Sequence, residues 1–170
     1  MDLAAFLAQH RDMLLYLAPS AALAVVIRVL AGVHPVFFMF TAAGTICHEL
    51  AHYCAGLVTG ARPGALTIIP RRVGQHWELG SVTLNRVRWY NAAPAALAPF
   101  AIILIPLAVA HWRTRQTLEF TALDVGIAFA LAPQFLSCWP SGTDWLIALR
   151  SWPYIFVIAG LYFLFQFVNP

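Results

Sequence analysis

Long apolar runs separated by short polar segments make up most of the chain. Crossing the hydrocarbon core of a bilayer takes roughly 20 helical residues, and four or five of these runs approach that length. The pattern therefore predicts an all-α polytopic membrane protein with four to five transmembrane helices, folded as a single domain over residues 1–170. The expected spans are 14–31, 34–59, 91–112, 118–137 and 144–168.

Residues 61–90 follow a different pattern. A β-prone run at 65–69 and a nearly alternating run at 77–84 flank a turn-like stretch rich in Pro, Arg and Gly. Such a pattern predicts a β-hairpin, here inserted between two helices and lying against the membrane. A second break, at Pro140, Ser141 and Gly142, separates the last two apolar runs. Such a break is tolerated at membrane depth where the backbone lines a cavity or is buried in protein.

Composition supports the membrane assignment. Apolar residues make up 61% of the chain and charged residues only 10%, whereas a soluble domain carries about 25% charged residues. The net charge of +3 comes with basic residues that are all Arg and mostly flank apolar runs. We therefore expect these arginines to lie next to the bilayer, and we do not expect a nucleic-acid partner. A basic leader is missing from the N-terminus, so the first run is expected to be a retained span.

Arginine placement predicts an orientation. If the spans alternate, five hairpin arginines fall on the same side of the membrane as Arg11, and Arg113 and Arg115 fall on the opposite side. The richer side is expected to be cytoplasmic, which puts the N-terminus and the hairpin on the cytoplasmic side of the cell membrane. The five hairpin arginines are Arg62, Arg71, Arg72, Arg86 and Arg88.

The second apolar run contains the motif His48-Glu49-Leu50-Ala51-His52. Residues four apart share one face of a helix, so both imidazoles can bind one metal ion, while Glu49 reaches a water on that ion. This is the arrangement of zinc hydrolysis, in which a carboxylate base takes a proton from a zinc-activated water. An ionisable residue within a membrane span is costly and usually functional. The structural alternative is a buried polar patch that hydrogen-bonds to neighbouring helices.

Two histidines do not hold zinc alone, so a third ligand is expected elsewhere. Asp144 is the favoured candidate, because it follows the 140–142 break and opens an apolar helix. The alternative is a helix N-cap role for Asp144, which Thr143 could share. The remaining acidic candidates are Asp2, Asp12, Glu78, Glu119 and Asp124.

Small residues continue the spacing of the two histidines. Gly44, Gly56 and Gly60 stand at four-residue intervals in line with His48 and His52. Small residues let neighbouring membrane helices approach closely. Close packing on both sides of the histidine pair is therefore expected, with or without catalysis.

With HExxH at 48–52 and Asp144 beyond a Pro-containing break, the chain resembles the site-2 protease family of intramembrane zinc metalloproteases, peptidase family M50, over about residues 34–150. The resemblance implies that His48, His52 and Asp144 bind Zn²⁺ and that Glu49 is the general base. It also implies that the hairpin presents substrate by strand addition. No PDZ domain is expected, so this would be a minimal catalytic core.

The chain departs from the family pattern at two places. Thr143-Asp144-Trp145 stands where the family usually has Leu-Asp-Gly, and Ala93-Pro94-Ala95-Ala96 keeps only the proline of Gly-Pro-x-x-Asn. The family's asparagine helps to position substrate. Asn91 or Gln134 are the candidates for that role here, each equally readable as a helix-end or packing group.

These observations predict an intramembrane zinc endopeptidase that cuts a transmembrane segment of another membrane protein. The first alternative is a partner-binding or regulatory protein that binds zinc without cleaving, and the second is a peptidase for lipidated or small hydrophobic peptides. Substrate identity and oligomeric state are not predicted.

Overall fold

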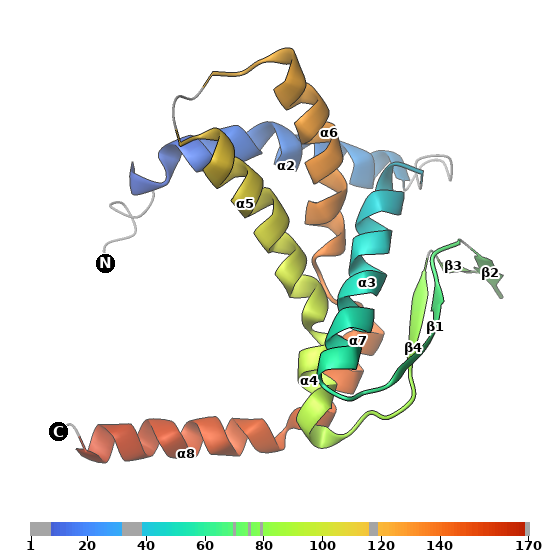
Figure 1. Cartoon of the computed structure of the whole chain (residues 1–170), viewed down its shortest axis with the longest axis vertical. Helices are drawn as coiled ribbons and strands as arrows, with labels where there is room; N and C mark the ends of the chain where they lie inside the picture. Colours follow the sequence, from blue (N-terminus) through green and yellow to red (C-terminus); the bar gives the residue numbers. More distant parts are fainter. Residues whose placement is uncertain are drawn as a thin grey trace. The chain divides into compact units, whose positions relative to one another are not determined.

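The computed structural model is mostly helical and carries a small antiparallel sheet region (Figure 1). It describes residues 8–31, 39–69, 71–74, 76–78, 80–115 and 119–168. The chain divides into two compact units, the first formed by Met1–His48 and Phe100–Trp139 and the second by Glu49–Pro99 and Pro140–Pro170. The helices are α2 (Arg11–Ala31), α3 (Ala42–Val58), α4 (Trp89–Ala96), η2 (Ala98–Ile103), α5 (Leu104–Arg113), α6 (Ala122–Ser137), α7 (Gly142–Ala148), η3 (Leu149–Ser151) and α8 (Pro153–Val168).

The core of the first unit lies where α2 packs against α5 and α6. One cluster joins Tyr16 and Leu17 of α2 to Ala110 of α5 and Leu131 of α6. A second cluster joins Ala24 and Ile27 of α2 to Ala132 of α6. Small alanines on α5 and α6 leave room for the larger side chains of α2, so the helices pack closely at these clusters.

A buried ion pair fastens the same three helices at one end. Asp124 of α6 is 2% exposed and accepts two hydrogen bonds from the Arg113 guanidinium, each 2.8 Å long. The hydroxyl of Tyr16 donates to the same carboxylate at 2.8 Å, and Thr121 donates to it from both its backbone N–H and its hydroxyl. A buried carboxylate is tolerated because its lone pairs are satisfied in this way.

In the second unit α3 ends in a Schellman motif. Gly60 has a φ of 74°, a left-handed conformation that glycine adopts without steric cost. The N–H of Ala61 donates to the carbonyl of Gly56 at 2.8 Å, and that of Gly60 donates to the carbonyl of Leu57 at 3.3 Å. This motif turns the chain from the helix directly into the first strand.

The predicted hairpin is confirmed. Strand β1 (Pro63–Thr67) pairs antiparallel with β4 (Ser81–Leu84), and β2 (Arg71–Val73) pairs antiparallel with β3 (His76–Glu78) farther along the same ribbon. The pairing of β1 with β4 shifts in register between Pro63 and Leu66. An irregularity of this kind bends a ribbon and increases its twist.

Two helices are long and apolar enough to cross a membrane, namely Arg11–Ala31 and the stretch Trp89–Arg113 formed by α4, η2 and α5. The bent pair Ala122–Ser137 and Gly142–Ser151 makes a third candidate if it counts as one span. The described chain therefore holds two to three candidate spans. The helix with the HExxH motif, α3, has 17 residues and is not among them; residues 34–38, where its run was expected to begin, lie outside the described part.

The last apolar run differs from its prediction as a single span over 144–168. It consists of α7, the short η3 and α8, which begins at Pro153. Proline has no N–H to donate and fits the first position of a helix, so α8 starts anew there and does not continue η3.

The arginine argument assumed that successive spans alternate in direction, and the arrangement of α2 and α5 in the first unit does not follow that rule. Residues at the start of α2 and at the end of α5 line one cavity, so these two helix ends lie at the same end of the first unit. Alternation places Arg11 opposite Arg113 and Arg115. In this unit α2 packs on α6 through Leu131 and Ala132.

Candidate metal centre

Helix α3 carries the two histidines of the motif. His48 and His52 are four residues apart in one continuous helix, so their side chains leave the same face. Upstream, Gly44 packs against α6 so closely that a Cβ there would lie 2.2 Å from the carbonyl oxygen of Pro133. Downstream, a Cβ at Gly56 would lie 2.9 Å from Leu84. Close packing is confirmed at Gly44 and at Gly56, where the hairpin is the neighbour, whereas nothing lies within 4 Å of a Cβ at Gly60.

A backbone carbonyl orients each imidazole. Nδ1 of His48 lies 2.7 Å from the carbonyl oxygen of Ser137, and Nδ1 of His52 lies 2.9 Å from that of Ala95. A carbonyl only accepts, so Nδ1 is the protonated nitrogen in both rings. Nε2 is therefore the nitrogen that each ring presents to a metal, and the carbonyls fix both tautomer and ring orientation, as around metal-bound histidines in general.

The carboxylate of Asp144 serves two purposes. One oxygen, Oδ2, accepts the N–H of Ser141 at 2.7 Å, while the N–H of Asp144 donates to the Ser141 hydroxyl at 3.2 Å. This reciprocal pair is a capping box that starts α7. The other oxygen, Oδ1, lies 3.3 Å from Nε2 of His52. Asp144 therefore caps the start of α7 with one oxygen, with Ser141 as the N-cap, and faces His52 with the other.

The side chains of His48, His52 and Asp144 form a group that could hold a metal ion. One ligand atom from each of them lies within 4.8 Å of those of the other two. Two ligands at about 2.0–2.2 Å from a tetrahedral ion are roughly 3.3 to 3.5 Å apart, which matches the separation of His52 Nε2 and Asp144 Oδ1. Two imidazoles and one carboxylate are borderline ligands of the kind that zinc takes at catalytic sites, where the fourth position stays open.

Glu49 stands beside this group without belonging to it. It follows His48 directly in α3 and is 8% exposed; His52 and Asp144 are 6% and 9% exposed. Burying so many ionisable groups together is costly unless they are paired or coordinate a metal. The two imidazoles and the Asp144 carboxylate thus form the kind of group that a cation stabilises.

The element carrying the Ala95 carbonyl is itself held in place. The Ser151 hydroxyl accepts the N–H of Ala93 at 2.8 Å and donates to the carbonyl of Trp89. Ser151 therefore bridges a donor and an acceptor four residues apart in α4. This bridge ties α4 to η3, which directly follows the helix of Asp144. No sequence pattern marks such a serine in advance.

The other acidic candidates have different surroundings. Asp124 is enclosed in the ion pair with Arg113, Asp12 lines a cavity at the start of α2, and Glu119 is exposed. Asp2 and the side chain of Glu78 lie outside the described residues. Among the described residues, only His48, His52 and Asp144 form a group of this kind.

Asn91, the candidate for substrate positioning, is fully buried. Its Oδ1 accepts the N–H of Arg88 at 2.7 Å, and its Nδ2 donates to the carbonyls of Arg86 at 3.1 Å and Thr59 at 3.4 Å. These bonds cap the start of α4 and join it to the end of α3, which is the helix-end role. Substrate binding by Asn91 stays a prediction. The second candidate, Gln134, is also buried, and its Oε1 has no hydrogen-bond partner in the described part of the chain.

Comparison with protein-family models, with curated proteins and with solved structures found no match to this chain.

Proposed function

We propose that this chain is an intramembrane zinc metalloprotease of the site-2 type, which hydrolyses a peptide bond in or near a transmembrane segment of another membrane protein. The observation that carries the proposal is the convergence of His48, His52 and Asp144 to within 4.8 Å beside the buried Glu49. Three protein ligands plus an adjacent carboxylate are the parts that zinc-dependent peptide hydrolysis requires.

Each residue has one role in the proposal. The Nε2 atoms of His48 and His52 and the Oδ1 atom of Asp144 hold Zn²⁺, which when bound acts as a Lewis acid toward a water and a peptide carbonyl. Glu49 accepts a proton from the attacking water and delivers it to the leaving amine. The carbonyls of Ser137 and Ala95 keep the two imidazoles in the tautomer that binds metal.

The hairpin is proposed to receive the substrate. A transmembrane helix has to unwind before its peptide bonds can be attacked, and the backbone groups released then need partners. A two-stranded ribbon such as β1–β4 has open edges that supply them by strand addition. The arginines of the hairpin segment favour a cytoplasmic position for this side. We do not assign the N-terminus to the side of the hairpin, because the start of α2 and the end of α5 line the same cavity.

The test compares wild type with Glu49→Gln, both purified as the full chain in detergent. Zinc content is measured by elemental analysis, and cleavage is measured on a panel of reconstituted single-span substrates. We expect about one zinc per chain in both proteins, and a loss of cleavage in the variant of at least a hundredfold, because the base contributes about 10²–10⁴-fold. Equal cleavage by both would refute the protease.

The zinc-binding, non-cleaving alternative gives a separate outcome. In that case both proteins hold zinc and neither cleaves any substrate of the panel. Asp144→Ala reports on the ligand set alone, since zinc content unchanged in this variant would reject Asp144 as the third ligand.

A further inference from the structure

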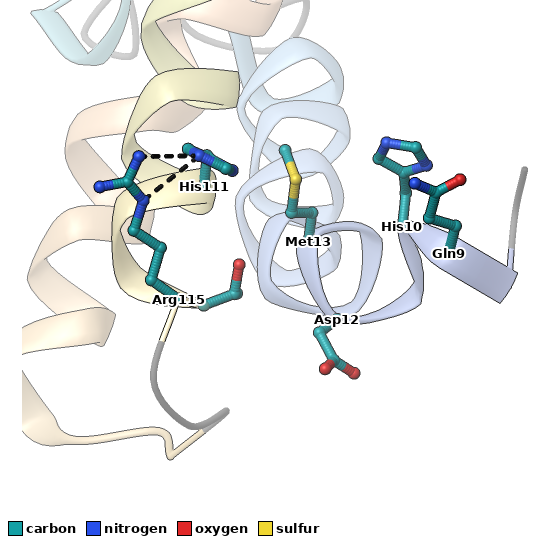
Figure 2. Close-up of a pocket in the computed structure, with 7 residues that line it drawn as sticks. Gln9, His10, Asp12, Met13, His111 and Arg115 are labelled. Atoms are coloured by element: carbon teal, nitrogen blue, oxygen red, sulfur yellow. Dashed lines mark hydrogen bonds between the residues drawn. The ribbon is translucent and has the colours of Figure 1, made fainter.

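A cavity of about 310 Å³ lies in the first unit, between the start of α2 and the end of α5. It shares no residue with the proposed metal centre. Six of its seven lining residues are polar or ionisable, in a chain in which apolar residues make up 61%. The cavity is lined by Gln9, His10, Asp12, Met13, His111, Thr114 and Arg115 (Figure 2).

Arg115 and His111 form a preorganised donor pair on the α5 side. Nε and Nη2 of Arg115 both lie 3.3 Å from Nε2 of His111, as the dashed lines in Figure 2 show. The guanidinium only donates, so Nε2 is the acceptor and the imidazole carries its proton on Nδ1. The pair therefore combines a permanent positive charge with a neutral N–H donor. A planar guanidinium held in one orientation suits the oxygens of a phosphate.

The α2 side of the cavity adds neutral and weakly basic groups. Gln9 and His10 project together from the chain just before α2, whereas the Asp12 carboxylate points away from them (Figure 2). Asp12 thus brings one negative charge to the wall, pointing away from Gln9 and His10. The arrangement favours an anion at the Arg115 side of the cavity.

The position of the cavity indicates where that anion comes from. It lies at the first residues of the candidate span Arg11–Ala31 and at the last residues of the candidate span Trp89–Arg113. Helix ends of this kind meet the headgroup layer of a bilayer, where tryptophan is also enriched. Trp112, Leu14 and Leu15 are exposed and neighbour lining residues in the sequence, so these helix ends offer apolar side chains to acyl chains.

We propose that this cavity binds the phosphate group of a membrane phospholipid. Arg115, held by His111, contacts the phosphate oxygens, while the acyl chains lie along the apolar surface next to the cavity. Its volume is at the lower end of the range for small-molecule sites, about 300–1,000 Å³, which suits a headgroup and not a whole lipid. Free inorganic phosphate shares this chemistry but lacks the acyl chains.

The test uses the full chain in detergent and three probes: short-chain phosphatidylglycerol, short-chain diacylglycerol and inorganic phosphate. Binding is followed by intrinsic tryptophan fluorescence, for which Trp112 is a nearby reporter. We expect the phospholipid to bind at least tenfold more tightly than either of the other probes, because only it combines phosphate with acyl chains. Equal affinity for inorganic phosphate would overturn the lipid assignment, and equal affinity for diacylglycerol would overturn the phosphate contact.

Variants locate the site. Arg115→Gln is expected to weaken phosphatidylglycerol binding by about tenfold to a hundredfold, the range for a charge-assisted contact, and His111→Gln by a smaller factor because it only orients Arg115. The matched control is Arg150→Gln, which removes another exposed arginine, in η3, outside the cavity lining. An unchanged unfolding midpoint in Arg115→Gln shows that the protein is intact. An equal loss in the Arg115 and Arg150 variants would overturn the proposal.

Discussion

Gly44 is a residue whose missing side chain matters to the candidate metal centre. A Cβ there would lie 2.2 Å from the Pro133 carbonyl oxygen and 2.4 Å from the Ser137 hydroxyl oxygen. Gly44→Ala therefore has to push α3 and α6 apart, which we expect to cost about 1–3 kcal/mol of unfolding free energy. Zinc affinity should fall too, since Ser137 supplies the carbonyl that orients His48.

Thermal unfolding in detergent and zinc titration measure these two effects. Gly126→Ala in α6 is the matched control, because nothing lies within 4 Å of its added Cβ. Alanine is the better helix former, so that variant should gain up to about 1 kcal/mol. Equal midpoints for the two variants would contradict the close approach at Gly44.

Gln134 shows the opposite situation, a buried polar side chain that contributes little to folding. Its Oε1 has no hydrogen-bond partner among the described residues, and an unsatisfied buried acceptor costs about 1–3 kcal/mol. Gln134→Met keeps the size and removes that cost, so its unfolding midpoint should equal or exceed that of wild type. A midpoint several degrees lower would show that the carbonyl is engaged. Cleavage measured on the same sample tests the second interpretation of Gln134, substrate positioning.

Two aspartates in this chain show how far local sequence predicts a site. Thr121 precedes Asp124 by three residues, as Ser141 precedes Asp144, and both pairs form capping boxes. The local pattern therefore predicts the two helix starts equally well and cannot separate their functions. The side chains around each aspartate separate their functions: Arg113 neutralises Asp124, whereas Asp144 faces His52. Such contacts, over 11 residues in one case and 92 in the other, depend on tertiary packing.

At the scale of elements, the length of apolar runs predicted helices α2 and α4–α5, and alternation around a turn-like stretch predicted the hairpin, because each is defined by local pattern. The single span expected over 144–168 was wrong, since run length alone does not reveal that a helix restarts at Pro153. The bridge from Ser151 to α4 was also beyond prediction. A hydroxyl inserted between two backbone groups of another helix leaves no periodic signal in the sequence.

That bridge gives an element-scale prediction. Ser151→Ala removes the partner of the Ala93 N–H and of the Trp89 carbonyl, and we expect a loss of about 1–2 kcal/mol. Because α4 also carries the Ala95 carbonyl that orients His52, zinc affinity should fall by up to about tenfold, the lower end of the effect of outer-shell partners. Thr45→Ala is the control, since the hydroxyl it removes donates to the carbonyl of Thr41, one turn earlier in the same segment. A Ser151 variant with unaltered zinc affinity would contradict the link between α4 and the centre.

For the whole molecule, zinc binding and folding stability should be coupled. The proposed ligands come from α3 and α7, segments more than 80 residues apart in the sequence, so the unfolded chain does not present them together. Free zinc at a thousandfold its dissociation constant then stabilises the native state by about 4 kcal/mol. Chelation should lower the unfolding midpoint of wild type and of Glu49→Gln alike, because Glu49 is not a ligand in the proposed centre. In Asp144→Ala the midpoint should no longer respond to zinc. If neither zinc nor a chelator changes the unfolding midpoint of wild type, the three side chains hold no metal. That result would also refute the proposed hydrolysis.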